Sequence, residues 1–305
     1  MRSAKGGSVS MDYRAGTVAV VGRTNVGKST FINAIMGRKV VIVSERPQTT
    51  RNRIRCILTT PEAQVVFVDT PGLHKPMNQL SAHLQREAFR SLAGVDAVAY
   101  MVEPSRVVDA YDATMLSRFQ PLPCPKVLLV NKSDQAKGNA VPETLLAYGR
   151  LGIFSDMVPI SSTKGTNLDR ALAVIIGHLP KGAPSSPEGA STDRPLAFVA
   201  AEIVREKVYA ATYQEVPYST AVTVEEIEER ETPPLVSIYA TVVVAKDSQK
   251  AIVIGSQGAK LKEIGTQARV ELEDLLGRKV FLSIHVKVRP KWTEDEAEIA
   301  RLAGD

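Results

Sequence analysis

The fold of this chain is decided by one stretch, Gly22-Arg23-Thr24-Asn25-Val26-Gly27-Lys28-Ser29-Thr30. Two glycines five positions apart precede a lysine and a serine, after the apolar run Thr17–Val21 and before helical periodicity that starts at Phe31. This order is typical of a phosphate-binding loop, in which backbone N–H groups and a helix N-terminus converge on phosphate oxygens. Lys28 is expected to neutralise the outer phosphates and Ser29 to ligate magnesium. The alternative is a chance glycine-rich turn, which the motifs downstream disfavour.

Length and composition predict a globular protein of two domains. The chain has 305 residues, of which 44% are hydrophobic and 23% charged. Chains of this length usually fold as more than one domain, each with its own hydrophobic core. No apolar run reaches the roughly 20 residues that span a bilayer, so any membrane contact would be peripheral. Residues 1–15 lack the apolar segment of a signal peptide and are expected to form a disordered lead-in. The two cysteines, Cys56 and Cys124, show no metal-ligand spacing and favour a reducing cytoplasm.

The formal charge of +5 is concentrated near the C-terminus. Between Lys246 and Lys291 there are ten lysines or arginines against five acids, a difference equal to the charge of the whole chain. Such a distribution is typical of a domain that binds a polyanion. On charge alone, a solvated helix face explains it equally well.

The first half of the chain predicts an α/β domain. From Thr17 to about Leu179, short β-branched runs alternate with longer helical segments, which indicates a mostly parallel sheet covered by helices on both faces. We expect strands at 17–21, 53–58, 64–68, 97–102, 126–130 and 157–160, and helices at 81–92, 110–118, 142–151 and 167–178.

A change of composition marks the boundary between the domains. Residues 181–193 are rich in Pro, Gly and Ser without apolar periodicity, which predicts a linker after a first domain at 16–180. A small α+β domain is expected at 194–292, followed by a tail at 293–305. Its predicted helices lie at 196–207 and 259–276, and its strands at 221–227, 236–244 and 280–288.

A second motif, Asp69-Thr70-Pro71-Gly72, follows the apolar strand predicted at 64–68. In a parallel sheet its carboxylate lies at the C-terminal edge of the strands, where ligands bind. We expect Asp69 to support the magnesium ion and the Gly72 N–H to sense a terminal phosphate. The same tetrapeptide would also favour an ordinary turn, so the assignment depends on its spacing after the phosphate-binding loop.

The motif that discriminates between bases is Asn131-Lys132-Ser133-Asp134, directly after the strand at 126–130. Asp134 can accept two hydrogen bonds from the N1–H and exocyclic amino groups of guanine. Adenine lacks this pair of donors and would leave a desolvated carboxylate unpaired. The loop Ser161-Ser162-Thr163-Lys164-Gly165 is placed to donate backbone N–H groups to the guanine oxygen, although an ordinary capped turn has the same composition.

Together these four motifs resemble the translation-factor-like class of small GTPases, over about residues 16–180. The resemblance implies an α/β P-loop GTPase domain that hydrolyses GTP to GDP and in which Asn131 with Asp134 reads guanine. One departure is Ser162, where this class usually has alanine. The nucleotide-binding residues that it implies are Gly22, Arg23, Thr24, Asn25, Val26, Gly27, Lys28, Ser29, Thr30, Asp69, Thr70, Pro71, Gly72, Asn131, Lys132, Asp134, Ser161, Ser162 and Thr163.

The same resemblance implies a magnesium ion held by Ser29, Asp69 and a switch threonine. That threonine belongs to Gln48-Thr49-Thr50-Arg51, and we favour Thr50 because it precedes the arginine, with Thr49 as the alternative. The residues expected to act in hydrolysis are Asn25, Lys28, Thr50, Asp69 and Gly72.

Two residues bear on how water is activated. Leu73 stands after Gly72, where many GTPases have a glutamine that orients the attacking water, and a leucine cannot do this. In GTPases that have a hydrophobic residue in place of this glutamine, an asparagine in the phosphate loop often holds a potassium ion, and Asn25 matches that position. We therefore expect slow hydrolysis that is faster in potassium than in sodium.

In the C-terminal domain, a Gly-x-x-Gly loop lies between an apolar segment and a basic amphipathic helix. The loop and its flanks resemble a type II KH domain, which clamps the backbone of about four single-stranded nucleotides. A helix-capping turn is the alternative for the loop without its flanks. The expected RNA-binding residues are Ile254, Gly255, Ser256, Gln257, Gly258, Ala259, Lys260, Lys262 and Arg269.

A GTPase domain followed by a KH domain resembles the Era family of ribosome-assembly GTPases, over about residues 16–292. Further residues similar to that family are His74, the segment Glu215-Val216-Pro217-Tyr218 and Trp292. The resemblance implies a cytoplasmic monomer that binds the 3′ region of 16S rRNA, assists assembly of the 30S subunit and associates peripherally with the inner face of the membrane. For the membrane, the sequence itself offers only basic charge.

Two other classes of protein share some of these features. The first is a membrane-associated signalling GTPase whose basic domain binds lipid or protein, but a polybasic lipid binder needs no glycine loop. The second is an RNA-binding module with a degenerate nucleotide fold, which the intact phosphate, magnesium and base motifs disfavour.

Overall fold

A computed structural model describes residues 12–44, 50–51, 53–73, 78–104, 107–187 and 189–303. The chain divides into two compact units. The first unit draws on Met1–Val41, Arg53–Leu73 and Ala88–Asp193, and the second on Ile42–Asn52, His74–Glu87 and Arg194–Asp305.

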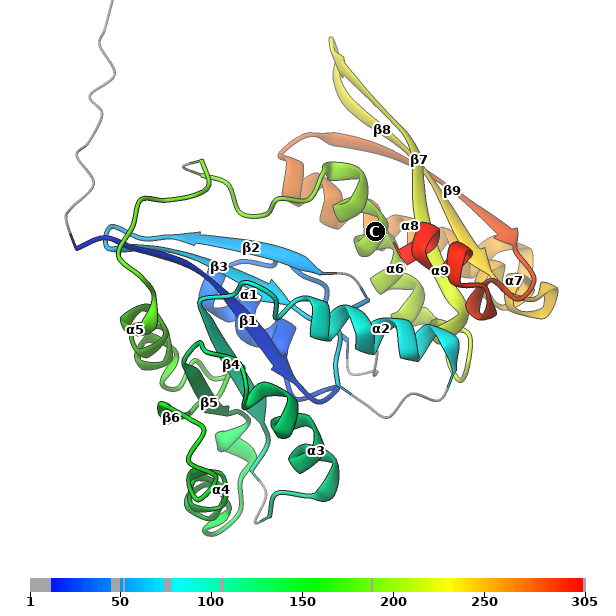
Figure 1. Ribbon diagram of the computed structural model, residues 1–305. Coiled ribbons are helices and arrows are strands. Elements are labelled where there is room, and N and C mark those ends of the chain that lie inside the picture. The colour runs from blue at the N-terminus through cyan, green and yellow to red at the C-terminus, as the bar shows by residue number, and fades with distance from the viewer. Residues whose placement is uncertain are drawn as a thin grey trace, which may run out of the picture. The chain divides into compact units, whose positions relative to one another are not determined.

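The first unit is built on a six-stranded sheet with the strand order β2-β3-β1-β4-β5-β6 (Figure 1). Only β2 runs antiparallel to its neighbour, which confirms the mostly parallel sheet that the sequence predicts. The strands are β1 (Arg14–Gly22), β2 (Ile54–Thr59), β3 (Ala63–Asp69), β4 (Ala97–Val102), β5 (Lys126–Val130) and β6 (Asp156–Pro159).

Helices bury both faces of this sheet. On β1 the neighbouring residues Val20 and Val21 are both inaccessible to solvent, although successive side chains point to opposite faces. Val21 belongs to a cluster with Met115 of α3 and Tyr148 of α4, while α1 and α5 contact each other. The helices are α1 (Lys28–Met36), α2 (Gln79–Arg90), α3 (Ala110–Phe119), α4 (Ala140–Gly149) and α5 (Leu168–His178), and α2 belongs to the second unit up to Glu87.

Two predicted boundaries need correction. β1 begins at Arg14, so the end of the predicted lead-in at 1–15 is part of the sheet, and residues 1–11 lie outside the described residues. The predicted linker is bound along the first unit, because the buried Gln64 side chain accepts hydrogen bonds from the N–H groups of Ser185 and Ser186 at 2.8 and 2.9 Å. Ile57 also donates its N–H to Ser191.

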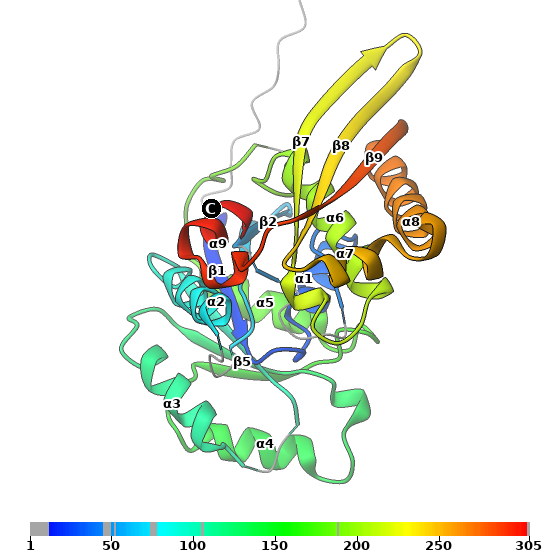
Figure 2. The same ribbon diagram turned by 90° about the vertical axis from the view of Figure 1, so that its right-hand side faces the viewer.

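The core of the second unit is a three-stranded sheet with one face covered by helices (Figure 2). The long β7–β8 hairpin is antiparallel, and β9 adds in parallel to β8. This confirms the small α+β domain. The elements are α6 (Leu196–Ala211), β7 (Thr220–Glu231), β8 (Pro234–Val244), α7 (Asp247–Ile254), α8 (Ala259–Leu276) and β9 (Lys279–Val288).

The predicted C-terminal tail is a structured part of this unit. Residues Glu296–Ala303 form helix α9, whose Ile299 and Leu302 pack in one buried cluster with Trp292. Leu80 and Leu84 of α2 belong to the same cluster. The tail therefore extends the second core through two buried side chains, Ile299 and Leu302.

Candidate nucleotide and RNA sites

The phosphate-binding loop joins the end of β1 to the start of α1, as predicted. Gly27 has φ 98°, and a Cβ there would lie 2.3 Å from Nδ2 of Asn131, so only glycine fits. The Lys28 ammonium curls back over the loop and donates to the carbonyl oxygens of Gly22 at 3.2 Å and Arg23 at 2.9 Å. Burial lowers the pKa of Lys28 to about 8, against the opposing pull of the Asp69 carboxylate. A phosphate anion would supply the countercharge that the buried ammonium needs.

The residues predicted to hold magnesium meet at the edge of the sheet. Asp69 ends β3, pairs in register with Val20 of β1 and is fully buried. Its Oδ2 accepts a hydrogen bond of 2.8 Å from Oγ of Ser29. A hydroxyl and a carboxylate oxygen this close fit a hard cation such as Mg²⁺, which would supply positive charge against the phosphates of a bound nucleotide.

The third predicted magnesium ligand, Thr50, belongs to the second unit and is 6% exposed. Thr49 lies outside the described residues, so the choice between the two threonines stays a prediction.

The Asp69–Gly72 motif is held against the phosphate-binding loop. Oγ1 of Thr70 donates to the carbonyl of Val20 at 2.8 Å, and the N–H of Leu73 donates to the carbonyl of Gly22 at 3.0 Å. The Leu73 side chain is 2% exposed and packs in the core with Tyr100 and Phe119, so it cannot orient a water molecule.

Asn25 is exposed at the tip of the same loop, with a left-handed φ of 63°. Its neighbour Arg23 makes contacts that sequence reasoning missed. The Arg23 guanidinium pairs with Asp109 at 2.7 Å and lies 5.1 Å from the centre of the Tyr111 ring. A buried carboxylate, Asp112, is 3.7 Å from Nε of Arg23. These contacts fix the first turn of the loop to the start of α3.

In the base-binding motif, the side chain of Asn131 has protein partners on two loops. This side chain is 2% exposed, donates from Nδ2 to the carbonyl of Val26 at 2.8 Å, and accepts at Oδ1 from the N–H and Oγ of Ser162 at 3.0 and 2.9 Å. Asn131 therefore ties the phosphate loop to the loop after β6, and Asp134 of the same motif is exposed. The hydroxyl of Ser162, where the class usually has alanine, strengthens this tie.

The Gly-x-x-Gly loop joins helix α7 to helix α8. Gly255 caps α7 by donating its N–H to Ala251 at 2.9 Å, and α8 begins directly after Gly258. Ser256 and Gln257 at the tip are exposed. A nucleic-acid backbone can therefore approach the main chain of the loop closely.

Beside the loop lies a groove of about 400 Å³. Lys262 and Arg269 of α8 contribute charge, and Leu282 and Ile284 of β9 contribute an apolar wall. Sequence reasoning missed the two β9 residues, because alternation along that strand indicates inward-facing positions without showing which of them border a groove. The groove is lined by Gly258, Leu261, Lys262, Gly265, Thr266, Arg269, Leu282 and Ile284.

The fold and the sites define a P-loop nucleotide-binding domain of the GTPase type followed by a KH domain. Comparison with known families agrees. Residues 17–132 match the family of 50S ribosome-binding GTPases, and residues 215–293 match the KH domain.

Similar proteins are found over almost the whole chain. GTPase Era of Geobacter metallireducens is 44% identical over 95% of this chain and 97% of its own, and GTPase Era of Thermotoga maritima is 46% identical over 96% and 98%. The chain belongs to the Era family of GTPases.

Two solved structures share its fold. An Aquifex aeolicus Era variant bound to GDP and AlF4⁻ is 38% identical with a TM-score of 0.90, over 95% of this chain and 99% of that one. An Era in complex with MgGDPNP and nucleotides 1506–1542 of 16S ribosomal RNA is 39% identical with a TM-score of 0.90, over 96% and 99%.

Proposed function

We propose that this protein is a GTP-driven switch that binds the single-stranded 3′ region of 16S rRNA through its C-terminal domain and assists assembly of the 30S subunit. The observation that carries the proposal is the groove between α8 and β9, which combines a glycine loop, basic side chains and an apolar wall. The similar Era bound to nucleotides 1506–1542 of 16S rRNA supports the choice of RNA.

In this proposal each part of the groove takes a different part of the RNA. The backbone phosphates pass the loop at Gly255–Gly258, where Lys260 and Lys262 supply positive charge. Unstacked bases enter the groove and contact Leu282 and Ile284. A single-stranded segment of about four nucleotides would fill such a site.

The nucleotide site is proposed to select GTP through Asp134. Its carboxylate would accept from N1–H and the amino group of guanine, while Asn131 keeps the surrounding loops in place. Lys28 would contact the outer phosphates, and Ser29 with Asp69 would hold the metal.

Because Leu73 is buried, another group must position the attacking water. Asn25, exposed on the phosphate loop, is proposed to hold a potassium ion beside the phosphates. Hydrolysis should then be faster in potassium than in sodium chloride at equal ionic strength, and equal rates would contradict this role.

The proposal is tested by measuring binding of a short RNA that ends in the 3′ tail of 16S rRNA, with a non-hydrolysable GTP analogue and then with GDP. Gly258→Asp and Gly277→Asp make a matched pair, because both glycines have left-handed φ, at 79° and 63°, and no atom lies within 4 Å of where a Cβ would be. Each variant adds one negative charge at an end of α8.

Gly258→Asp should reduce RNA affinity at least about tenfold, because it places a charge against phosphate, while Gly277→Asp should change it less than about threefold. Equal effects of the two variants, or no RNA binding by the unaltered protein in either nucleotide state, would overturn the RNA assignment.

Anionic vesicles in the same assay test the lipid alternative. None of the helices in the described part of the chain combines the length and apolar character needed to cross a bilayer. If the target is a lipid surface, each variant should weaken binding to the vesicles by only about 1 kcal/mol, and the two variants should do so equally.

A further inference from the structure

The side chain of Arg51 is buried in the second unit, at 3% exposure, among uncharged acceptors. Nη1 donates to the carbonyl of Thr220 at 2.7 Å, and Nη2 donates to the hydroxyl of Tyr209 at 2.6 Å. Nη2 also lies 3.0 Å from the carbonyl oxygens of both Pro217 and Tyr218. No carboxylate of the described residues forms an ion pair with Arg51. Its positive charge is therefore buried without a countercharge.

The nearby carboxylate of Glu202 is engaged by a different arginine. Arg205, also 3% exposed, donates to it from Nε at 2.8 Å and from Nη2 at 2.6 Å. Burial lowers the pKa of Arg51, against the effect of Tyr209 and with that of Arg205. Burial opposes protonation of Arg205 as well, but Glu202 raises the pKa of that guanidinium. The two arginines and the glutamate together carry one buried positive charge in excess.

One donor of Arg51 also lacks an acceptor. Its Nε is buried and makes no hydrogen bond to any residue that the structure describes. Most buried polar atoms in native proteins have a partner, and a buried donor without one is costly. Nε is therefore available to donate to a bound anion.

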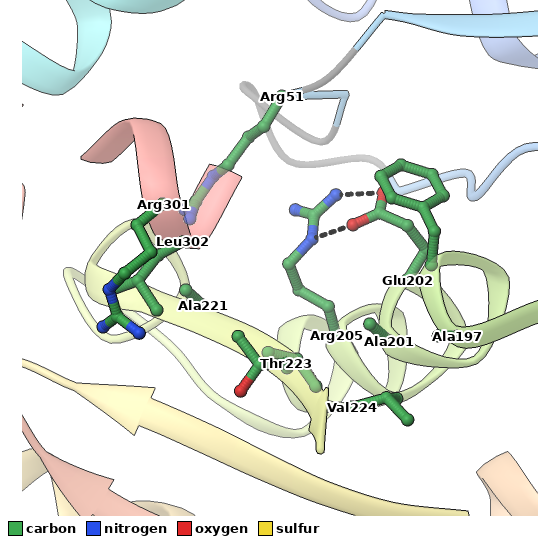
Figure 3. A pocket seen from close by; sticks show the side chains of 12 residues that line it. Arg51, Ala197, Ala201, Glu202, Arg205, Ala221, Thr223, Val224, Arg301 and Leu302 are labelled. Atoms are coloured by element: carbon green, nitrogen blue, oxygen red, sulfur yellow. Dashed lines mark hydrogen bonds and ion pairs between the residues drawn. The ribbon is translucent and has the colours of Figure 1, made fainter. Parts of the chain in front are cut away.

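Arg51 lines a cavity of about 200 Å³ formed by α6, the start of β7 and α9, all of them in the second unit (Figure 3). Figure 3 shows the Arg205–Glu202 pair on α6 and Leu302 on α9 at this cavity. Its walls are mostly apolar, with Ala197 and Ala201 of α6, Val222 and Val224 of β7, and Leu302. None of its lining residues belongs to the groove beside the Gly-x-x-Gly loop.

Charge and size restrict the kind of molecule that fits. One excess positive charge matches a single negative charge, whereas a phosphate dianion would bring a second. The third arginine of the lining, Arg301, is half exposed and already paired with Glu298 at 2.8 Å. Pockets for drug-sized ligands measure about 300 to 1,000 Å³, so this cavity suits a smaller molecule. Its apolar walls favour a hydrocarbon body.

We propose that this cavity is a binding site for a small carboxylic acid with an apolar body, whose carboxylate pairs with Arg51. The Nε–H of Arg51 donates to a carboxylate oxygen in a charge-assisted hydrogen bond. The hydrocarbon part packs against Val222, Val224 and Leu302. The site gives the C-terminal unit a small-molecule ligand in addition to nucleic acid, and it requires neither GTP nor RNA.

The test titrates acetate, butyrate and benzoate into the full-length protein by calorimetry at constant ionic strength. The protein is saturated with GDP, so that the phosphate-binding loop is not open to the added anions. Benzoate or butyrate should bind with a Kd of about 1 mM or lower and raise the Tm. The neutral isosteres benzamide and butyramide should bind at least about tenfold more weakly, because they lack the charge that pairs with the guanidinium.

Two alanines of α6 provide a matched pair of variants. Ala197 lines the cavity, whereas Ala210 is exposed and does not. Ala197→Leu fills the cavity without changing any charge and should weaken carboxylate binding at least about tenfold, while Ala210→Leu should change it less than about twofold. Arg51→Met removes the excess charge and should abolish the preference for the acid over the amide. Where that variant fails to fold, the alanine pair still decides the question.

Three results would each overturn the proposal. The first is no binding of any of the three acids up to about 10 mM. The second is equal binding of acids and amides, and the third is an equal effect of Ala197→Leu and Ala210→Leu. Inorganic phosphate is titrated in the same way, and tighter binding of phosphate than of every acid would contradict the assignment to a monoanion.

Discussion

A larger side chain at Gly265 should weaken RNA binding without destabilising the protein. Gly265 lies within α8 on the wall of the groove, and a Cβ there would be 3.7 Å from Cδ1 of Ile284, an ordinary van der Waals contact. Gly265→Ala therefore fits without strain and should stabilise the protein by about 0.5 to 1 kcal/mol, since glycine costs that much in a helix interior. For a domain of this size the gain is a rise in Tm of a few degrees.

Gly265→Leu keeps a good helix former but fills the groove beside Ile284. If a base lies there, its exclusion costs about 1 to 3 kcal/mol, the usual contribution of one stacked base. RNA affinity should then fall about 5- to 150-fold, while thermal unfolding shows no loss of stability. Fluorescence anisotropy with the same short RNA at fixed salt measures the binding.

Gly177 of α5 provides the control, because it is also a helical glycine and a Cβ there would have no atom within 4 Å. Gly177→Leu should leave RNA binding unchanged. A folded Gly265→Leu protein that binds RNA as well as the unaltered one would show that the bases lie elsewhere.

Four further predictions concern the nucleotide site. Gly27→Ala should reduce GTP and GDP affinity about 100-fold by calorimetric titration, because its Cβ would displace Asn131 and its φ of 98° is strained for alanine; retained affinity would contradict the loop geometry. Asp134→Asn should weaken GTP about 1,000-fold in competition binding and favour xanthosine triphosphate, whose 2-oxo group accepts from an amide; retained guanine preference would refute the role of the carboxylate. Ser162→Ala removes one of two hydrogen bonds to Asn131 Oδ1, so GTP affinity should fall less than about tenfold; complete loss would mean the hydroxyl has another task. Because the pKa of Lys28 falls from 10.5 unfolded to about 8 folded, the unfolded chain binds more protons between these pH values. The free energy of unfolding of the nucleotide-free protein should therefore rise by up to about 3 kcal/mol as the pH increases through that range. Urea unfolding should show Lys28→Met lacking this gain, and an equal pH dependence would place its origin elsewhere.

The sequence was sufficient to predict those elements and motifs that a short local pattern determines. Apolar runs of strand length predict β4 and β5 with their correct ends, and the glycine spacing locates the phosphate-binding loop. The order of motifs along the chain then places Asp69 beside Ser29, because both follow neighbouring parallel strands.

The sequence was insufficient where the partner of a residue lies far along the chain. Arg51 and its acceptor Thr220 are 169 positions apart, and no local pattern links them. Helix α9 was expected as a tail, since Ile299 and Leu302 give too little periodicity to distinguish a helix that packs on Trp292 from a charged extension. The contact of Asn131 with a base stays a prediction, while its hydrogen bonds to Val26 and Ser162 join residues too far apart in the sequence for any local pattern to link them.

Two stretches from the first half of the chain, Arg51 and most of α2, have an energetic reason to stay in the second unit. Leu80 and Leu84 of α2 are buried against Trp292, Ile299 and Leu302, and each such side chain contributes about 1.5 to 3 kcal/mol when it is removed from water. Arg51 adds four hydrogen bonds, to Tyr209, Pro217, Tyr218 and Thr220, which water would have to replace if the side chain left this unit. Removing Arg51 and α2 from the second unit would therefore expose apolar area and leave buried carbonyl oxygens without their donor. Both stretches thus belong energetically to the unit that holds the groove beside the Gly-x-x-Gly loop, although they precede most of the first unit in the sequence.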